Sequence, residues 1–195
     1  DARGVAWDLA RDISSSAAAQ QLATTMIPKN ATASQPFFDN AAREILDGII
    51  ATLIRIAPGK WTLRDVVLAG RDPRLMRALF QKFPARAATL EAYLSNERGG
   101  ADILSTLRTH LYDFAVVAAS LSHAKKRASI EDWLAGAGVL VLGNSDRSRA
   151  AVDALNRLFL ARLGDLLLDG PEVNPRTQSK RTWLFLDEFR ELGKL

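Results

Sequence analysis

Two adjacent carboxylates near the end of the chain are the residues whose types best suit catalysis. Asp187 and Glu188 directly follow four apolar residues in the string TWLFLDEFRELGKL, residues 182–195. A short continuous apolar run of this kind predicts a buried strand. Ligands of a parallel α/β sheet gather at the carboxyl ends of its strands, where both carboxylates would then lie. There an aspartate holds Mg²⁺, which prefers carboxylate oxygen, and a glutamate orients and deprotonates an attacking water.

This arrangement is typical of a Walker B element in a P-loop ATPase. A structural interpretation stays open beside it, because Asp187 can equally cap a helix formed by the residues that follow. A Walker B element also needs a phosphate-binding loop, G-x-x-x-x-G-K-[ST]. Neither Gly59-Lys60 nor Gly193-Lys194 is followed by Ser or Thr, so the loop is absent from this sequence. We therefore expect the chain alone neither to bind ATP well nor to hydrolyse it.

The composition fits a soluble protein with a sizeable core. The chain has 195 residues, 48% of them hydrophobic, and a formal net charge of +4, which permits an acidic partner without requiring one. The absence of cysteine excludes disulfides and thiolate chemistry. No metal-ligand spacing surrounds His110 or His123, and we expect His110 to be a half-buried helix residue. No apolar run reaches the ~20 residues that span a bilayer, and a start at Asp1 suggests a piece of a longer or processed chain.

Most of the sequence up to residue 127 has helical periodicity. Local signals support it: Thr62 and Asp65 resemble a capping box, Asp72-Pro73 opens another helix, and Gly99-Gly100 separates two helices. Ser129 is placed to cap a short helix of its own. These patterns predict a helical bundle with segments at 17–26, 37–53, 62–70, 73–83, 86–95 and 101–123.

The pattern changes at Gly138. The string GVLVLGNS, residues 138–145, predicts a buried strand and a turn, after which Ser145 or Asp146 caps a long helix. The string TWLFLD predicts a second strand, so this region would be a right-handed βαβ unit with parallel strands. The first residues, DARGVAWDL, would be the incoming edge of the same α/β domain, with the helical part as an insertion.

The string TWLFLDEFRELGKL resembles the Walker B region of the coupling proteins of type IV secretion and conjugation, the TraD/TraG-type DNA-translocating ATPases. Other segments are similar in their order and pattern. They are VAWDLARDI at 5–13, ATTMIP at 23–28, FFDNAAREILDGIIATL at 37–53 and the stretch 129–163. The resemblance thus covers nearly the whole chain, with its most specific part at the Walker B end.

The resemblance implies a mainly α chain, with an all-α helical bundle domain at 14–135 inserted in a RecA-like P-loop α/β domain. Residues 1–13 would be the edge of the RecA-like domain and 136–195 its βαβ segment. Asp187 matches the Mg²⁺-binding aspartate and Glu188 the catalytic glutamate. The parent would be a membrane-anchored homo-hexamer that uses ATP and Mg²⁺ at the cytoplasmic face of the bacterial inner membrane, this segment being soluble and cytoplasmic.

The resemblance also implies partners and substrates. The all-α domain would recognise relaxase, relaxosome or effector proteins, and the parent would bind DNA and other secretion-system components. Arg147 and Arg149 would sense a neighbouring subunit's phosphate, unless they are solvated arginines at a helix start. Lys125, Lys126 and Arg127 would contact DNA phosphates, unless they complement the dipole of their own helix.

Two other functions remain open from the sequence. One is a helical protein–protein interaction module without catalysis, in which Asp187 and Glu188 are structural. The other is a segment of a different hexameric DNA-pumping ATPase of the RecA-like group.

Overall fold

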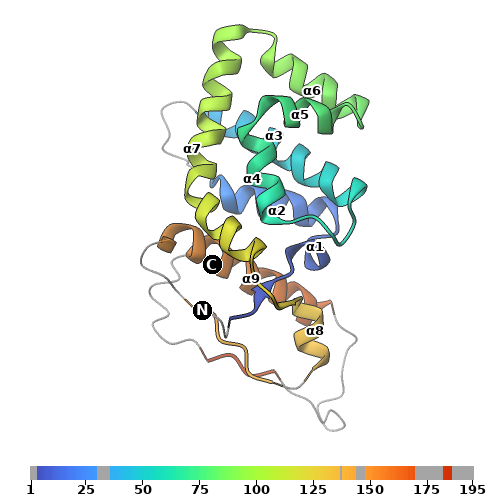
Figure 1. Ribbon diagram of the computed structural model, residues 1–195, viewed down its shortest axis with the longest axis vertical. Helices are drawn as coiled ribbons and strands as arrows, with labels where there is room; N and C mark the ends of the chain where they lie inside the picture. Colours follow the sequence, from blue (N-terminus) through green and yellow to red (C-terminus); the bar gives the residue numbers. More distant parts are fainter. Residues whose placement is uncertain (1–3, 30–35, 137, 144–147, 170–181, 186–195) are drawn as a thin grey trace.

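The computed structural model describes residues 4–29, 36–136, 138–143, 148–169 and 182–185 (Figure 1). These ranges contain nine helices and one short parallel pair of strands. In chain order the elements are β1 (Ala6–Trp7), α1 (Leu9–Asp12), α2 (Ser16–Met26), α3 (Pro36–Ile56), α4 (Leu63–Arg71), α5 (Pro73–Phe80), α6 (Pro84–Leu94), α7 (Glu97–Ser122), β2 (Arg127–Ala128), α8 (Ile130–Ala135) and α9 (Arg149–Leu168). The prediction of a mainly helical chain is confirmed.

Local signals in the sequence set several helix starts. Before α4, the Thr62 side chain accepts from the Asp65 backbone N–H, and the Asp65 carboxylate accepts from the Thr62 backbone N–H at 2.8 Å. Asp72 caps α5 by accepting from a backbone N–H of its first turn. Ser129 and Asp132 form a second capping box at α8. Each cap satisfies N–H groups that have no partner within the helix, and the predicted starts are confirmed.

The longest helix differs from its prediction. Helix α7 starts at Glu97 rather than at residue 101, because the Asn96 side chain caps it by accepting from Gly99 N–H at 3.0 Å. Gly99 and Gly100 therefore lie in its first turn and do not separate it from another helix. A Cβ added at Gly100 would lie 3.1 Å from Leu94 Cα, so a small residue is needed where α7 turns back against α6.

One continuous hydrophobic core includes buried residues from each of the helices α1 to α7 and from α9. In Figure 1, α7 runs down one side of the helical part, and both α3 and α4 pack against it. The buried side chains of α3 and α7 include Leu46, Ile49, Leu107 and Leu111, which follow the i, i+3, i+4 spacing of a core-facing stripe. Helix α4 comes close to α7 at Gly70, where an added Cβ would lie 2.3 Å from Leu111 Cδ1.

The two ends of the helical segment meet in the short strand pair. β1 and β2 are parallel, with Ala6 opposite Arg127 and Trp7 opposite Ala128. The backbone N–H of Ala6 donates to Lys126 O at 3.0 Å, and that of Asp8 donates to Ala128 O at 2.9 Å. The chain thus enters and leaves the helical segment at one place.

The two predicted buried strands are not found in the described residues. Neither 138–143 nor 182–185 belongs to a strand there. Val141 is 81% exposed and Phe185 91%, whereas Leu142 is 37% exposed. The prediction of burial on both faces is therefore wrong here. The physical reason is that an apolar stretch becomes a strand only when another backbone pairs with it, and the described part of the chain supplies none.

Helix α9 follows where the sequence predicted a long helix, and it packs against α2 and α7. Its expected caps, Ser145 and Asp146, lie outside the described residues. A small second core of Ile130, Phe159 and Leu163, with Trp7 packed against it, ties α8 and α9 to β1. In the ranges given above, no helix has both the length and the apolar character needed to cross a bilayer.

Candidate nucleic-acid interface

Some of the candidate site residues proposed from the sequence lie among the described residues. Asp187, Glu188 and Arg147 lie outside them, so their proposed roles remain predictions. Arg149 is the first residue of α9, and its Nε lies 3.6 Å from Asp153 Oδ2. This spacing of four residues is the ordinary geometry of an ion pair on a helix surface, and it agrees with the structural interpretation of Arg149.

The basic residues after α7 lie beside a fourth cation that the sequence analysis missed. Helix α4 runs antiparallel to α7, so the start of α4 lies at the end of α7. There the Arg64 guanidinium donates from Nη1 to Ser122 Oγ at 3.5 Å. Arg64 and the three cations that follow α7 are all exposed. We call this set the basic cluster; its members are Arg64, Lys125, Lys126 and Arg127.

The basic cluster carries positive charge that its surroundings do not neutralise. Among the described residues, none of its four cations forms an ion pair with a carboxylate, whereas Arg11, Arg77 and Arg86 each do. Cations that lack carboxylate partners are available to neutralise phosphates and release their counterions. The exposed, unpaired charge makes the cluster the candidate contact for a nucleic-acid backbone.

Arg127 has a structural role as well. Its Nη2 lies 3.4 Å from the carbonyl oxygens of Leu121 and Ser122, the last residues of α7. A cation beside these carbonyls complements the negative end of the helix dipole. This geometry agrees with the structural alternative for Arg127, whereas Arg64, Lys125 and Lys126 make no such contact with the α7 carbonyls among the described residues.

A buried carboxylate joins the first segment of the chain to α8. Asp12 is 3% exposed. Its Oδ2 accepts from Trp7 Nε1 at 2.5 Å and from the Ile130 backbone N–H at 2.8 Å. Its own carbonyl oxygen accepts from Arg162 Nη2 of α9 at 3.2 Å. One residue therefore connects β1, α8 and α9. The sequence analysis missed it, because the string LARD of α1 does not distinguish a buried carboxylate from an exposed one.

A surface pair reinforces the same connection. The Arg11 guanidinium binds both carboxylate oxygens of Asp132, with Nη2 and Oδ1 2.9 Å apart. The hydrogen bonds that Arg11 donates to the Asp132 carboxylate raise the pKa of Arg11 and lower the pKa of Asp132. Because both side chains are about half exposed, the pair sets orientation more than it adds stability. We call the Asp12 and Arg11 contacts together the junction.

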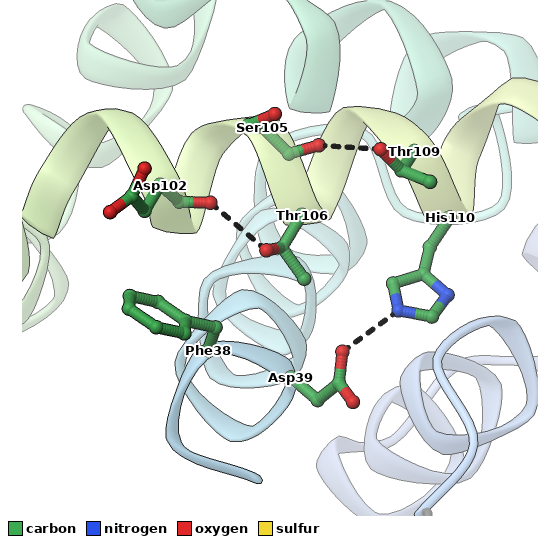
Figure 2. A pocket seen from close by; sticks show the side chains of 7 residues that line it. All are labelled: Phe38, Asp39, Asp102, Ser105, Thr106, Thr109 and His110. Atoms are coloured by element: carbon green, nitrogen blue, oxygen red, sulfur yellow. Dashed lines mark hydrogen bonds and ion pairs between the residues drawn. The ribbon is translucent and has the colours of Figure 1, made fainter. Parts of the chain in front are cut away.

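A polar pocket lies where the start of α3 meets α7 (Figure 2). Its volume is about 550 Å³. His110 Nε2 lies 3.0 Å from Asp39 Oδ1, and the two side chains are 30% and 24% exposed. The expectation of a half-buried helix histidine is thus confirmed, and no group of metal-ligating side chains is present in the part of the chain that the structure covers. The pocket is lined by Phe38, Asp39, Asp102, Ser105, Thr106, Thr109 and His110.

The fold and the basic cluster together define a helical domain suited to binding an acidic polymer. Comparison with known families makes the class specific: residues 1–195 match the type IV secretion-system coupling protein DNA-binding domain. The chain belongs to this family, which confirms the resemblance seen in the sequence. Comparisons with curated proteins and with solved structures gave no significant match.

Proposed function

We propose that this chain is the substrate-recruiting segment of a type IV secretion coupling ATPase and that it contacts DNA through the basic cluster. The family match over residues 1–195 carries the proposal. The exposed cations Arg64, Lys125 and Lys126 support it, because they lack carboxylate partners among the described residues. The family match also favours this function over a different DNA-pumping ATPase and over an interaction module unrelated to secretion.

The position of the strand pair supports the insertion of an all-α domain into a motor domain. A domain inserted into another needs its entry and exit side by side, and β1 and β2 pair directly at those two points. In the proposed parent, ATP hydrolysis would occur in the motor domain of a homo-hexamer. The junction would then hold the helical domain to the motor segments.

The proposed chemistry of the motor rests on Asp187 and Glu188. Mg²⁺, when bound with ATP, would supply charge neutralisation at the phosphates. Asp187 would hold that ion, and Glu188 would orient and deprotonate the attacking water. In the full-length parent, Glu188→Gln is expected to abolish hydrolysis and keep ATP binding, because the amide cannot accept the proton. Turnover at the parental rate would remove Glu188 from this role.

Salt-dependent DNA binding tests the role of the basic cluster. Fluorescence anisotropy with a labelled duplex would compare the chain with a triple variant in which Arg64, Lys125 and Lys126 are each replaced by Gln. The slope of log affinity against log salt is negative, and each lost phosphate contact reduces its magnitude by about 0.9. The slope measured for the triple variant is therefore expected to be smaller in magnitude by about 2–3.

A matched control removes the same amount of charge elsewhere. Arg74, Lys82 and Arg98 are exposed, and none of them forms an ion pair with a carboxylate within the described ranges. Their triple Gln variant is expected to reduce the magnitude of the slope by less than about 1, because the three residues lie away from the C-terminal end of α7. An equal loss in both triple variants, or no loss in the first, would show that the cluster is not the DNA contact.

A further inference from the structure

The lysines of the basic cluster follow the C-terminal end of α7, beside the strand pair (Figure 1). The last carbonyl oxygens of a helix have no partner within the helix, and the aligned peptide dipoles give that end a partial negative charge. Such an end repels a phosphate, whereas the N-terminal end of a helix attracts one. A contact with a DNA backbone at the end of α7 is therefore favoured when these carbonyl oxygens are covered by positive charge.

Arg127 supplies positive charge at this end of the helix. Its Nη2 lies 3.4 Å from both Leu121 O and Ser122 O. Leu121 O also accepts from a backbone N–H, that of Ala124, at 3.4 Å. In the part of the chain that the structure covers, the guanidinium is the only hydrogen-bond donor to Ser122 O. Without Arg127, this carbonyl oxygen would lack a protein partner next to the cations that are proposed to bind phosphate.

Arg127 also closes the turn that carries the two lysines. At one end of this turn the Ala124 N–H bonds to the last turn of α7 at 3.4 Å, and at the other end Lys126 O accepts from Ala6 N–H at 3.0 Å. The Arg127 side chain reaches back from β2 to the carbonyl oxygens of α7. The backbone of Lys125 and Lys126 is thus held at both ends, while their exposed side chains form no ion pair in the described ranges. A contact that is ordered before binding loses less conformational entropy when DNA arrives.

We propose that Arg127 is a positioning residue of the DNA contact. It covers the carbonyl oxygens at the end of α7 and holds the turn of Lys125 and Lys126, and it does not itself bind a phosphate. The geometry separates Arg127 from the other cations of the basic cluster, which make no contact with the α7 carbonyl oxygens among the described residues. This inference rests on the proposed function, because the role of Arg127 depends on DNA binding by the basic cluster.

Arg127→Met tests the inference, because methionine keeps a long side chain and removes both the charge and the N–H donors. In the anisotropy assay with the labelled duplex, its affinity is expected to fall about five-fold, from the lost charge at the helix end and the loosened turn. The magnitude of its salt slope is expected to change by less than about 0.5, because the number of phosphate contacts stays the same. Lys126→Gln is the comparison and is expected to reduce that magnitude by about 0.9. An unchanged affinity of Arg127→Met, or a reduction of its slope by about 0.9 as well, would overturn the proposal.

Two control variants separate this role from a general loss of charge or of folded structure. Arg98→Met removes an exposed arginine in the first turn of α7 and is expected to change the affinity less than about two-fold. Arg127→Lys keeps a cation beside the carbonyl oxygens and is expected to bind within about two-fold of the unsubstituted chain. Equal losses in Arg98→Met and Arg127→Met, or binding by Arg127→Lys as weak as that by Arg127→Met, would contradict the positioning role.

A last comparison distinguishes failure of this inference from failure of the proposed function. It adds Arg127→Met to the triple variant of Arg64, Lys125 and Lys126. A positioning residue has no effect once the residues that it positions are gone, so the added substitution is expected to lower the affinity less than about two-fold. A loss of about five-fold that persists in this background would refute the positioning role alone. A triple variant with the affinity and salt slope of the unsubstituted chain would refute the DNA contact of the basic cluster, and with it the role of Arg127.

Discussion

Replacing Asp12 is expected to break the link between the first segment of the chain and α8. In Asp12→Ala, Trp7 Nε1–H and the Ile130 backbone N–H both lose their acceptor in a site where Asp12 is 3% exposed. An unsatisfied buried donor costs about 1–3 kcal/mol, so the two together predict a loss of about 2–6 kcal/mol in the free energy of unfolding. Entry of water would bring the cost toward the lower end of that range.

A double-mutant cycle isolates the Trp7–Asp12 interaction. Trp7→Phe removes the donor and keeps an aromatic ring against Phe159, whose centroid lies 5.2 Å from that of Trp7. Urea unfolding followed by far-UV circular dichroism would give the stabilities of both single variants and the double variant. We expect the two substitutions to be coupled by about 1–2 kcal/mol, since residues in one hydrogen-bond network are not additive. Asp113→Ala, at an exposed position, serves as control and is expected to stay within about 0.5 kcal/mol.

Two results would refute this reasoning. A loss below about 1 kcal/mol in Asp12→Ala would mean that the donors find other acceptors. Additivity of Trp7→Phe and Asp12→Ala within about 0.5 kcal/mol would mean that the contact contributes no energy of its own. Hydrogen exchange at the Ile130 amide would distinguish local opening of the junction from global unfolding, since local opening leaves the α3 and α7 amides protected.

Two further predictions concern the helical core and its surface. Gly70→Ala is expected to destabilise the chain by about 1–3 kcal/mol in urea unfolding, because the added Cβ would lie 2.3 Å from Leu111 Cδ1. Gly164→Ala should stabilise α9 by up to ~1 kcal/mol, because nothing lies near the added Cβ. A stabilising Gly70→Ala together with a destabilising Gly164→Ala would contradict this packing. The hydrogen bond to Glu44, burial and the charge of Glu44 raise the pKa of Tyr93 to about 12. A phenol whose pKa is raised on folding stabilises the fold below its unfolded pKa of about 10 and loses that contribution as the pH rises to about 12. Tyrosinate absorbance should therefore show that Tyr93 ionises at a higher pH in the unsubstituted chain than in Glu44→Gln. Identical titration curves for the two chains would exclude the hydrogen bond to Glu44 as the cause.

The sequence predicted the helical part well where short-range chemistry decides. The capping box of Thr62 and Asp65 spans three residues, and its hydrogen bonds form whatever the rest of the chain does. Gly99-Gly100 was misread because glycine is a frequent helix breaker. The Asn96 cap and the close approach of Gly100 to Leu94 outweighed that tendency.

Contacts between residues far apart in the chain could not be predicted from the sequence alone. Arg64 and Ser122 are 58 positions apart, and Asp12 and Ile130 are 118 apart, so only the packing of helices shows that they meet. The strand predicted at 138–143 failed for a related reason. Apolar character indicates which residues prefer burial, but the backbone partner that makes a strand cannot be read from the stretch itself.

The arrangement along α7 gives the proposed DNA contact a direct mechanical connection to the junction. Lys126 belongs to the basic cluster, and its carbonyl oxygen accepts from Ala6 N–H at 3.0 Å. Trp7, the next residue, donates to Asp12. A pull on Lys125 or Lys126 therefore reaches β1 through one backbone hydrogen bond and Asp12 through one more. Helix α7 ends just before these residues and packs against α3 and α4, so a force on the basic cluster also reaches the helical core.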